Sequence, residues 1–217
     1  MLEAIAGRFP SGPTRGPLRD WLAFQRGKTG QRLARLIGQA RVRPHREILS
    51  AAIAEVLRLF AEPVCIETGC IRRAGEGTDS SLAIARALAG RGRFFTFELQ
   101  PAHIEVCKSV CAEHLDQIEF IEGDAAANLA EYKRAGNFDK LHFAFFDSAD
   151  DPAITMAEFE AVEDLFVPGS FVIVDDAVRG VKGRLIKPYL RANPSWRTRL
   201  VFAGNGMLLA QLKGDAT

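Results

Sequence analysis

Hydrophobic segments of two kinds alternate along residues 64–191 of this chain. Short apolar runs predict buried strands, and longer segments with apolar residues at helical spacing predict helices between them. Such an alternation is typical of a parallel sheet that helices cover on both faces. The predicted strands are 64–68, 94–98, 118–122, 141–147 and 171–175, and the predicted helices are 80–89, 101–114, 125–135, 153–166 and 181–191.

Both ends of the chain depart from this alternation. Near the C-terminus, the stretches RTRLVFA and MLLAQLK flank Gly204, Asn205 and Gly206, which tolerate positive φ and predict a β-hairpin. The last strand should then run antiparallel, which gives an α/β fold with a Rossmann-like, seven-stranded, mostly parallel sheet and helices on both faces. Extra helices are predicted at 18–25, 31–39 and 44–61. We therefore divide the chain into an N-terminal helical extension, residues 1–60, and one globular domain, residues 61–217.

Composition favours a soluble, cytoplasmic protein. The chain has 217 residues, of which 47% are hydrophobic, enough to bury one core. No apolar run approaches the roughly 20 residues of a transmembrane helix, and the N-terminus lacks the apolar centre of a signal peptide. Four cysteines fit a reducing compartment better than a disulfide framework. We expect no membrane partner.

Charge is distributed unevenly along the chain. The net charge is +1, but residues 1–46 carry +8 and the remainder carries −7. A basic segment can bind nucleic acid or another anionic partner. A helical extension that is solvated or contacts a second subunit explains the same charge, and we favour it, so that nucleic acid is an unlikely partner and a homodimer is possible.

Four potential zinc ligands share one face of the predicted helix 101–114. They are His103, Cys107, Cys111 and His114. They contain no CxxC pair, and the two cysteines also belong to an ordinary apolar stripe with Ile104. We therefore interpret this face as core rather than as a metal site.

The segment CIETGCIRRAGEGTDSSLAIARAL, residues 65–88, combines a strand, a glycine-rich turn and a helix N-terminus. Backbone N–H groups at such a turn form a ligand cradle. The dinucleotide fingerprint G-x-G-x-x-G is absent, and Glu67, just before Gly69, would repel a pyrophosphate. A cofactor with a cationic amino group would instead be attracted, which argues against a nicotinamide dehydrogenase.

The layout and motifs of residues 60–212 resemble those of the class I S-adenosylmethionine-dependent methyltransferases. The resemblance implies that Glu67 and Gly69 lie by the methionine part of the cofactor, that Glu98 accepts both ribose hydroxyls, and that Asp124 receives the adenine amino group. The turn departs from the commoner E-x-G-x-G-x-G, and Thr78 or Asp79 would equally serve to cap the following helix. The residues assigned to the cofactor are Glu67, Thr68, Gly69, Gly75, Thr78, Ser80, Ser81, Glu98, Leu99, Asp124, Ala125 and Asp147.

Three further aspartates follow predicted strands four and five. Asp147 ends one strand, and Asp175 and Asp176 end the next, so their carboxylates should converge at one sheet edge. The pattern resembles that of the metal-dependent O-methyltransferases of the catechol, caffeoyl-CoA and macrocin types, which implies that the three bind Mg²⁺ and that Asp147 is catalytic. The alternative is that they shape the pocket and cap the next helix.

One position departs from the catechol-type pattern. Those enzymes carry a lysine general base three residues after the first metal-binding aspartate, where this chain has Asp150. Metal activation could suffice, or the base could come from elsewhere. His142 lies inside a predicted strand, so we interpret it as a core histidine.

These observations predict an S-adenosylmethionine-dependent methyltransferase that transfers a methyl group to oxygen of a small, vicinally oxygenated molecule with the help of Mg²⁺. Two alternatives stay open. One is a metal-independent methyltransferase of an anionic or RNA substrate, and the other is a noncatalytic protein that only binds the cofactor.

Overall fold

A computed structural model describes residues 45–73, 79–201 and 205–214 of the chain. Their strands form one seven-stranded sheet in the order β3-β2-β1-β4-β5-β7-β6. β7 pairs antiparallel with both of its neighbours, whereas β1 to β5 pair in parallel. The predicted fold class is thereby confirmed. The strands are β1 (Val64–Thr68), β2 (Arg93–Glu98), β3 (Ile118–Glu122), β4 (Leu141–Phe146), β5 (Phe166–Val174), β6 (Trp196–Val201) and β7 (Met207–Leu212).

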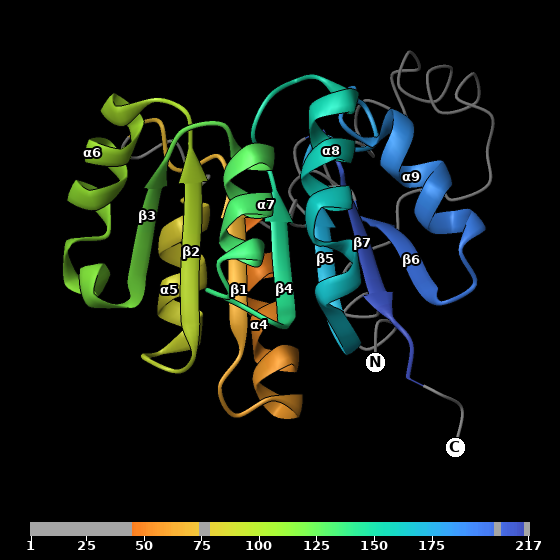
Figure 1. Ribbon diagram of the computed structural model, residues 1–217, viewed down its shortest axis with the longest axis horizontal. Helices are drawn as coiled ribbons and strands as arrows, with labels where there is room; N and C mark the ends of the chain where they lie inside the picture. Colours follow the sequence, from red (N-terminus) through yellow and green to blue (C-terminus); the bar gives the residue numbers. More distant parts are fainter. Residues whose placement is uncertain (1–44, 74–78, 202–204, 215–217) are drawn as a thin grey trace, which may run out of the picture.

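Helices cover both faces of the sheet (Figure 1). α4 and α5 pack against each other on one face, and α7, α8 and α9 form a row on the other. The helices are α4 (His45–Leu59), α5 (Ser80–Leu88), α6 (Pro101–Val110), α7 (Ala125–Arg134), α8 (Pro152–Val162) and α9 (Gly183–Ala192), with 3-10 turns η1 (Ala112–Gln117) and η2 (Glu163–Leu165).

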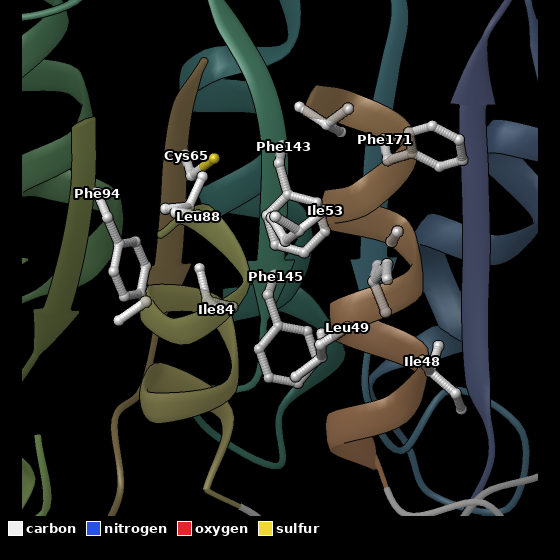
Figure 2. Close-up of a cluster of buried hydrophobic side chains, with 14 of the residues drawn as sticks. Ile48, Leu49, Ile53, Cys65, Ile84, Leu88, Phe94, Phe143, Phe145 and Phe171 are labelled. Atoms are coloured by element: carbon white, nitrogen blue, oxygen red, sulfur yellow. The ribbon is translucent and has the colours of Figure 1, made fainter. Parts of the chain in front are cut away.

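The central strands bury apolar side chains on both faces, because helices cover both. In β4, Phe143 and Phe145 face the α4–α5 layer, and Ala144 and Phe146 face the α7–α9 layer. Figure 2 shows how side chains of α4 and α5 meet the two phenylalanines of the first pair. Continuous apolar strands of this kind are what a parallel sheet covered on both faces requires.

The predicted boundary between the fourth helix and the fifth strand is wrong. We predicted a helix at 153–166 and a strand from 171, but α8 ends at Val162 and β5 begins at Phe166. Pro168 and Gly169 give this segment the composition of a turn. The sheet accommodates them through a register shift between Leu141 and Phe143 of β4, and Gly169 adopts φ +95°.

The predicted helix 101–114 also differs in its second half. α6 ends at Val110, and a separate 3-10 turn, η1, leads into β3. The hairpin strands β6 and β7 pair as predicted, although residues 202–204 between them lie outside the described residues.

α4 contributes to the central core. Ile48, Leu49, Ile53 and Val56 on this helix are fully buried against β4, β5 and α5. The helices predicted at 18–25 and 31–39 lie outside the described residues. Among the helices of the described segments, none is long and apolar enough to cross a membrane.

Candidate functional site

The carboxyl ends of β1, β4 and β5 meet at the point where the strand order reverses, which is where open α/β sheets bind ligands. The Asp147 N–H donates to the Thr68 carbonyl at 2.9 Å, and the Asp175 N–H donates to the Phe146 carbonyl at 3.1 Å. Gly69 has φ +77°, and a Cβ there would lie 2.5 Å from the Asp147 carbonyl oxygen. A glycine therefore lets the ends of β1 and β4 approach each other closely.

Glu67 is a fully buried carboxyl group at the end of β1. Its Oε2 accepts hydrogen bonds from Ser81 Oγ at 2.5 Å and Thr96 Oγ1 at 3.2 Å. Its Oε1 is buried without a hydrogen-bond partner among the described residues. Burial raises the pKa of Glu67 to about 8. Because a buried polar atom normally has a partner, the free oxygen points to a ligand group that donates to it.

Glu98 ends β2 beside this group, and backbone contacts fix its carboxylate. Oε2 accepts from the Cys70 N–H at 3.1 Å, and Oε1 accepts from the Gln100 N–H at 2.9 Å. His103 Nδ1 lies 3.2 Å from the same Oε1. A carboxylate has about four lone-pair sites, and these contacts occupy at most three of them, so the group can still accept a hydroxyl.

Asp124 follows β3 and caps α7, where its Oδ1 accepts from the Ala127 N–H at 2.8 Å. The Gly123 N–H donates to the Glu98 carbonyl at 3.0 Å, which joins the ends of β2 and β3. Leu99 directly follows Glu98 at the end of β2 and is 65% exposed. Ala125 begins α7. The strand-end residues predicted for the cofactor thus lie along one edge of the sheet.

The glycine-rich turn is described only in part. Gly75 and Thr78 fall in residues 74–78, which lie outside the described residues. Ser80 and Ser81 are buried in the first turn of α5. Asp79 precedes this helix without a side-chain capping hydrogen bond, and its buried Oδ1 also has no partner among the described residues.

Glu158 on α8 is a second buried acid at this edge, and the sequence did not suggest it. Thr68 Oγ1 donates to its Oε2 at 2.9 Å, and its Oε1 has no hydrogen-bond partner among the described residues. Burial raises the pKa of Glu158 to about 7, and the nearby Ser148 and Thr68 hydroxyl groups oppose this shift.

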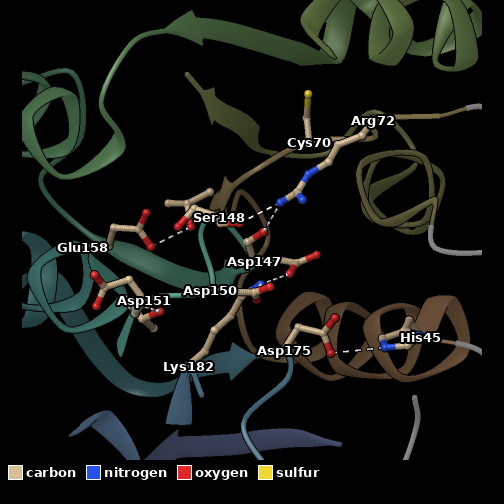
Figure 3. A network of polar contacts seen from close by, with 12 residues as sticks. His45, Cys70, Arg72, Asp147, Ser148, Asp150, Asp151, Glu158, Asp175 and Lys182 are labelled. Atoms are coloured by element: carbon tan, nitrogen blue, oxygen red, sulfur yellow. Dashed lines mark hydrogen bonds and ion pairs between the residues drawn. The ribbon is translucent and has the colours of Figure 1, made fainter. Parts of the chain in front are cut away.

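Lys182 is the residue that sequence reasoning missed most clearly. It lies at the N-terminus of α9, its side chain is 2% exposed, and its Nζ donates to Asp147 Oδ1 (Figure 3). Nζ also lies 3.9 Å from Asp150 Oδ1. Burial raises the pKa of Asp147 to about 6, and the Lys182 ammonium opposes this shift. No periodicity or motif in the sequence singles out this lysine.

The two aspartates after β5 have different surroundings. Asp175 Oδ1 lies 3.2 Å from His45 Nε2 on α4, a contact that raises the pKa of His45. Asp176 adopts φ +49°, which is uncommon for a residue other than glycine. Burial and the neighbouring Asp175 raise the pKa of Asp176.

The three predicted metal ligands therefore lie at neighbouring strand ends, but two of them already contact a basic side chain. Lys182 contacts Asp147, and His45 contacts Asp175. Across residues 45–73, 79–201 and 205–214, no group of three or more histidine, cysteine, aspartate or glutamate side chains is arranged to hold a metal ion. The set as it is arranged does not fit Mg²⁺, which prefers near-octahedral oxygen ligands.

The histidines interpreted from the sequence have structural contacts. His142 Nδ1 accepts from the Val64 N–H at 2.9 Å, at the start of β1 and β4 and so at the edge opposite Asp147. His103 contacts Glu98, and His114 Nδ1 lies 3.1 Å from Gln117 Nε2. Cys107 and Cys111 are fully buried in the core.

The sheet order, the antiparallel last strand and the acidic strand ends define a Rossmann-like fold of the class I S-adenosylmethionine-dependent methyltransferases. The chain belongs to the O-methyltransferase family, because the model of that family matches residues 66–193. It is therefore an O-methyltransferase by family, as predicted. A search of curated proteins finds no match.

Solved structures support the same fold. An O-methyltransferase from Bacillus cereus, in complex with SAH, is 21% identical with a TM-score of 0.65, over 84% of this chain and 90% of that one. TomG from Streptomyces achromogenes, an O-methyltransferase involved in tomaymycin synthesis and solved with SAM, is 26% identical with a TM-score of 0.60, over 75% and 78%. Cofactor-bound Rv0187 from MTB is 18% identical with a TM-score of 0.64, over 94% and 100%.

Proposed function

We propose that this chain binds S-adenosylmethionine along the carboxyl ends of β1, β2 and β3 and methylates an oxygen of a small molecule. The observation that carries the proposal is the unpartnered Oε1 of Glu67, a buried carboxyl oxygen in the position where a cationic amino group would bind. The solved structures of the Bacillus cereus enzyme with SAH and of TomG with SAM support the choice of cofactor.

Each strand end has a role in this proposal. Glu67 receives the amino group of the methionine part, Glu98 receives the ribose hydroxyls, and Asp124 receives the adenine amino group. A carboxylate suits a cis-diol because its two oxygens can each accept one O–H. The remaining proposed contacts are Thr68, Gly69, Gly75, Thr78, Ser80, Ser81, Leu99, Ala125 and Asp147.

S-adenosylmethionine supplies a methyl group bonded to a positively charged sulfur. The chain must hold an acceptor oxygen in line with that methyl group and remove the proton of the acceptor hydroxyl. Asp147 follows β4 next to Gly69, and its side chain is 31% exposed, so it can reach a bound molecule. We assign it as the catalytic residue, which accepts the hydroxyl proton.

The prediction of Mg²⁺ at Asp147, Asp175 and Asp176 stays a prediction that the contacts of the described residues do not support. Lys182 already pairs with Asp147, and His45 already contacts Asp175. The proposed transfer therefore relies on the side chains of the protein alone. A small molecule with an acidic hydroxyl group fits the proposal whether or not a second oxygen lies next to the first.

Isothermal titration calorimetry tests the cofactor assignment. SAH should bind and NAD should not, because the dinucleotide fingerprint is missing. Glu98→Ala should weaken SAH binding by roughly 1.5 to 3 kcal/mol, the range for hydrogen bonds to a charged group. Unchanged SAH affinity in a folded Glu98→Ala variant would refute the ribose assignment.

A transfer assay tests the activity. Labelled S-adenosylmethionine should label phenols, catechols or sugars in a panel that also contains RNA. Cofactor binding without labelling of any small molecule would favour the noncatalytic alternative. Labelling of RNA alone, with an affinity that falls steeply as salt rises, would favour the RNA alternative.

A further inference from the structure

We propose that the Lys182 ammonium takes the place of the divalent cation in this site and holds the acceptor oxygen of the substrate as an anion. This inference rests on the proposed methyl transfer, and it narrows the substrate class. The acceptor is a single acidic hydroxyl group, such as that of a phenol or an enol, and a vicinal pair of oxygens is not required.

The burial of Lys182 supports this role. Lysine is almost never fully buried unless it is paired, because removing an ammonium group from water is costly. Lys182 is 2% exposed and contacts Asp147, whose side chain is 31% exposed. The Lys182 side of this ion pair is thus enclosed by protein, and the Asp147 side reaches solvent at the strand ends. An ammonium has three donors, and Asp147 uses one of them.

The loop between β5 and α9 is built to hold this position. A Cβ at Gly180 would lie 2.4 Å from the Asp176 carbonyl oxygen, and a Cβ at Gly183 would lie 2.3 Å from the Ala177 carbonyl oxygen. The two glycines, two residues before and one residue after Lys182, therefore allow the loop to fold back tightly on itself.

Contacts with the β6–β7 turn fix the same loop from outside. The Ala177 N–H donates to the Gly206 carbonyl, and the Arg179 N–H donates to the Asn205 carbonyl, both at 2.8 Å. Asp176 is held at φ +49°, a conformation that persists only where surrounding structure determines it. The position of Lys182 is thus determined by backbone contacts on several sides.

The balance of charge explains why a metal ion is not needed. Asp147, Asp175 and Asp176 are three acids at adjoining strand ends, and the charge of Asp175 repels the carboxylates of both of the others. In the metal-dependent relatives that the motif resembles, a divalent ion would offset such repulsion. Here the Lys182 ammonium supplies positive charge in direct contact with Asp147, and His45, whose pKa the contact with Asp175 raises, lies against that second carboxylate. Lysine acts as a point charge, which suits one anionic oxygen rather than a chelated pair.

Mn²⁺ binding tests this inference without any substrate. Electron paramagnetic resonance of the full chain titrated with Mn²⁺ should show no bound ion in the wild type at low millimolar concentration. Lys182→Met removes the charge and keeps the length of the side chain, so it should expose the carboxylates and tighten Mn²⁺ binding roughly tenfold or more. Adding Asp147→Asn to that variant should abolish the gain.

Lys133→Met is a matched control, because Lys133 also pairs with an aspartate, Asp164 at 2.5 Å, but on the surface away from the site. It should leave Mn²⁺ unbound. Tight Mn²⁺ binding by the wild type that Asp147→Asn abolishes would overturn the inference, as would a folded Lys182→Met that gains no site. These results do not depend on turnover. If SAH fails to bind, the proposed function fails separately while the Mn²⁺ result stands.

In the transfer assay, excess EDTA should leave labelling by the wild type unchanged, and a phenol with one hydroxyl should serve as well as a catechol. Lys182→Met should lower kcat/KM at least tenfold, with partial recovery in Lys182→Arg, which keeps the positive charge. Labelling that EDTA abolishes would contradict a lysine in place of the metal.

Discussion

At the scale of single residues, the site depends on charged groups that the fold removes from water. Glu67 is fully buried with one free oxygen, and Lys182 is buried against Asp147. An acid that is buried without a cationic partner takes up a proton more readily, whereas a lysine beside a carboxylate keeps its charge. Glu67 is thus prepared to lose a proton when a cationic group arrives.

This property of Glu67 gives a prediction about pH. Its pKa rises from 4.5 to about 8 on folding, so between these values the folded state binds more protons than the unfolded state. The contribution of Glu67 to the free energy of unfolding of the unliganded protein should therefore be fully present below pH 4.5 and should be lost as the pH rises through 8. Glu67→Gln should flatten this slope in urea unfolding measured at several pH values. A slope that the substitution leaves unchanged would show that Glu67 does not titrate this way.

Binding of S-adenosylmethionine should report the same proton. If its amino group pairs with ionised Glu67, binding below pH 8 must release a proton. The calorimetric enthalpy should then vary with the ionisation enthalpy of the buffer in the wild type and should vary less in Glu67→Gln. An enthalpy that is independent of the buffer in both proteins would place the amino group elsewhere.

At the scale of elements, the sequence predicts the sheet and the acids at its strand ends because both follow from local pattern. Glu67, Glu98 and Asp124 end apolar strands of a parallel sheet, so their common edge follows from the alternation alone. Lys182 could not be found in this way. Its position depends on hydrogen bonds between its loop and Asn205 and Gly206, which are distant in sequence, and these contacts leave no periodic signal. The start of β5 was missed for a similar reason, since its pairing with Leu141 outweighs Pro168 and Gly169.

The junction of β1 and β4 gives a prediction at this scale. Gly69 and Gly90 have almost the same backbone angle, φ +77° and φ +78°, but only a Cβ at Gly69 would collide with neighbouring backbone. Gly90→Ala should cost about 1 to 2 kcal/mol from the left-handed conformation alone. Gly69→Ala should cost more and should also weaken SAH binding, because the ends of β1 and β4 must separate. Equal losses of unfolding free energy in urea would contradict a close-packing role for Gly69.

At the scale of the whole molecule, one half of the sheet edge carries groups proposed for the cofactor and the other half carries groups proposed for the acceptor. The ends of β1, β2 and β3 carry Glu67, Glu98 and Asp124, proposed for the cofactor, and the ends of β4 and β5 with the N-terminus of α9 carry the groups proposed for the acceptor, of which Asp147 also lies next to the cofactor. The reversal of strand order between β1 and β4 places the two sets side by side. The arrangement explains how one edge can bring a methyl donor and an oxygen together.

This division predicts that the two halves can be disabled separately. SAH at 100 times its Kd should raise the free energy of unfolding by about 2.7 kcal/mol through mass action, and NAD should not. Lys182→Met should keep this increase, because SAH lacks the positive charge on sulfur and Lys182 is not among its proposed contacts, whereas Glu98→Ala should reduce it. In the transfer assay, by contrast, Lys182→Met should lower kcat/KM. Thermal unfolding with and without SAH measures the stabilisation. If a folded Lys182→Met variant is no longer stabilised by SAH, the lysine serves the cofactor rather than the acceptor.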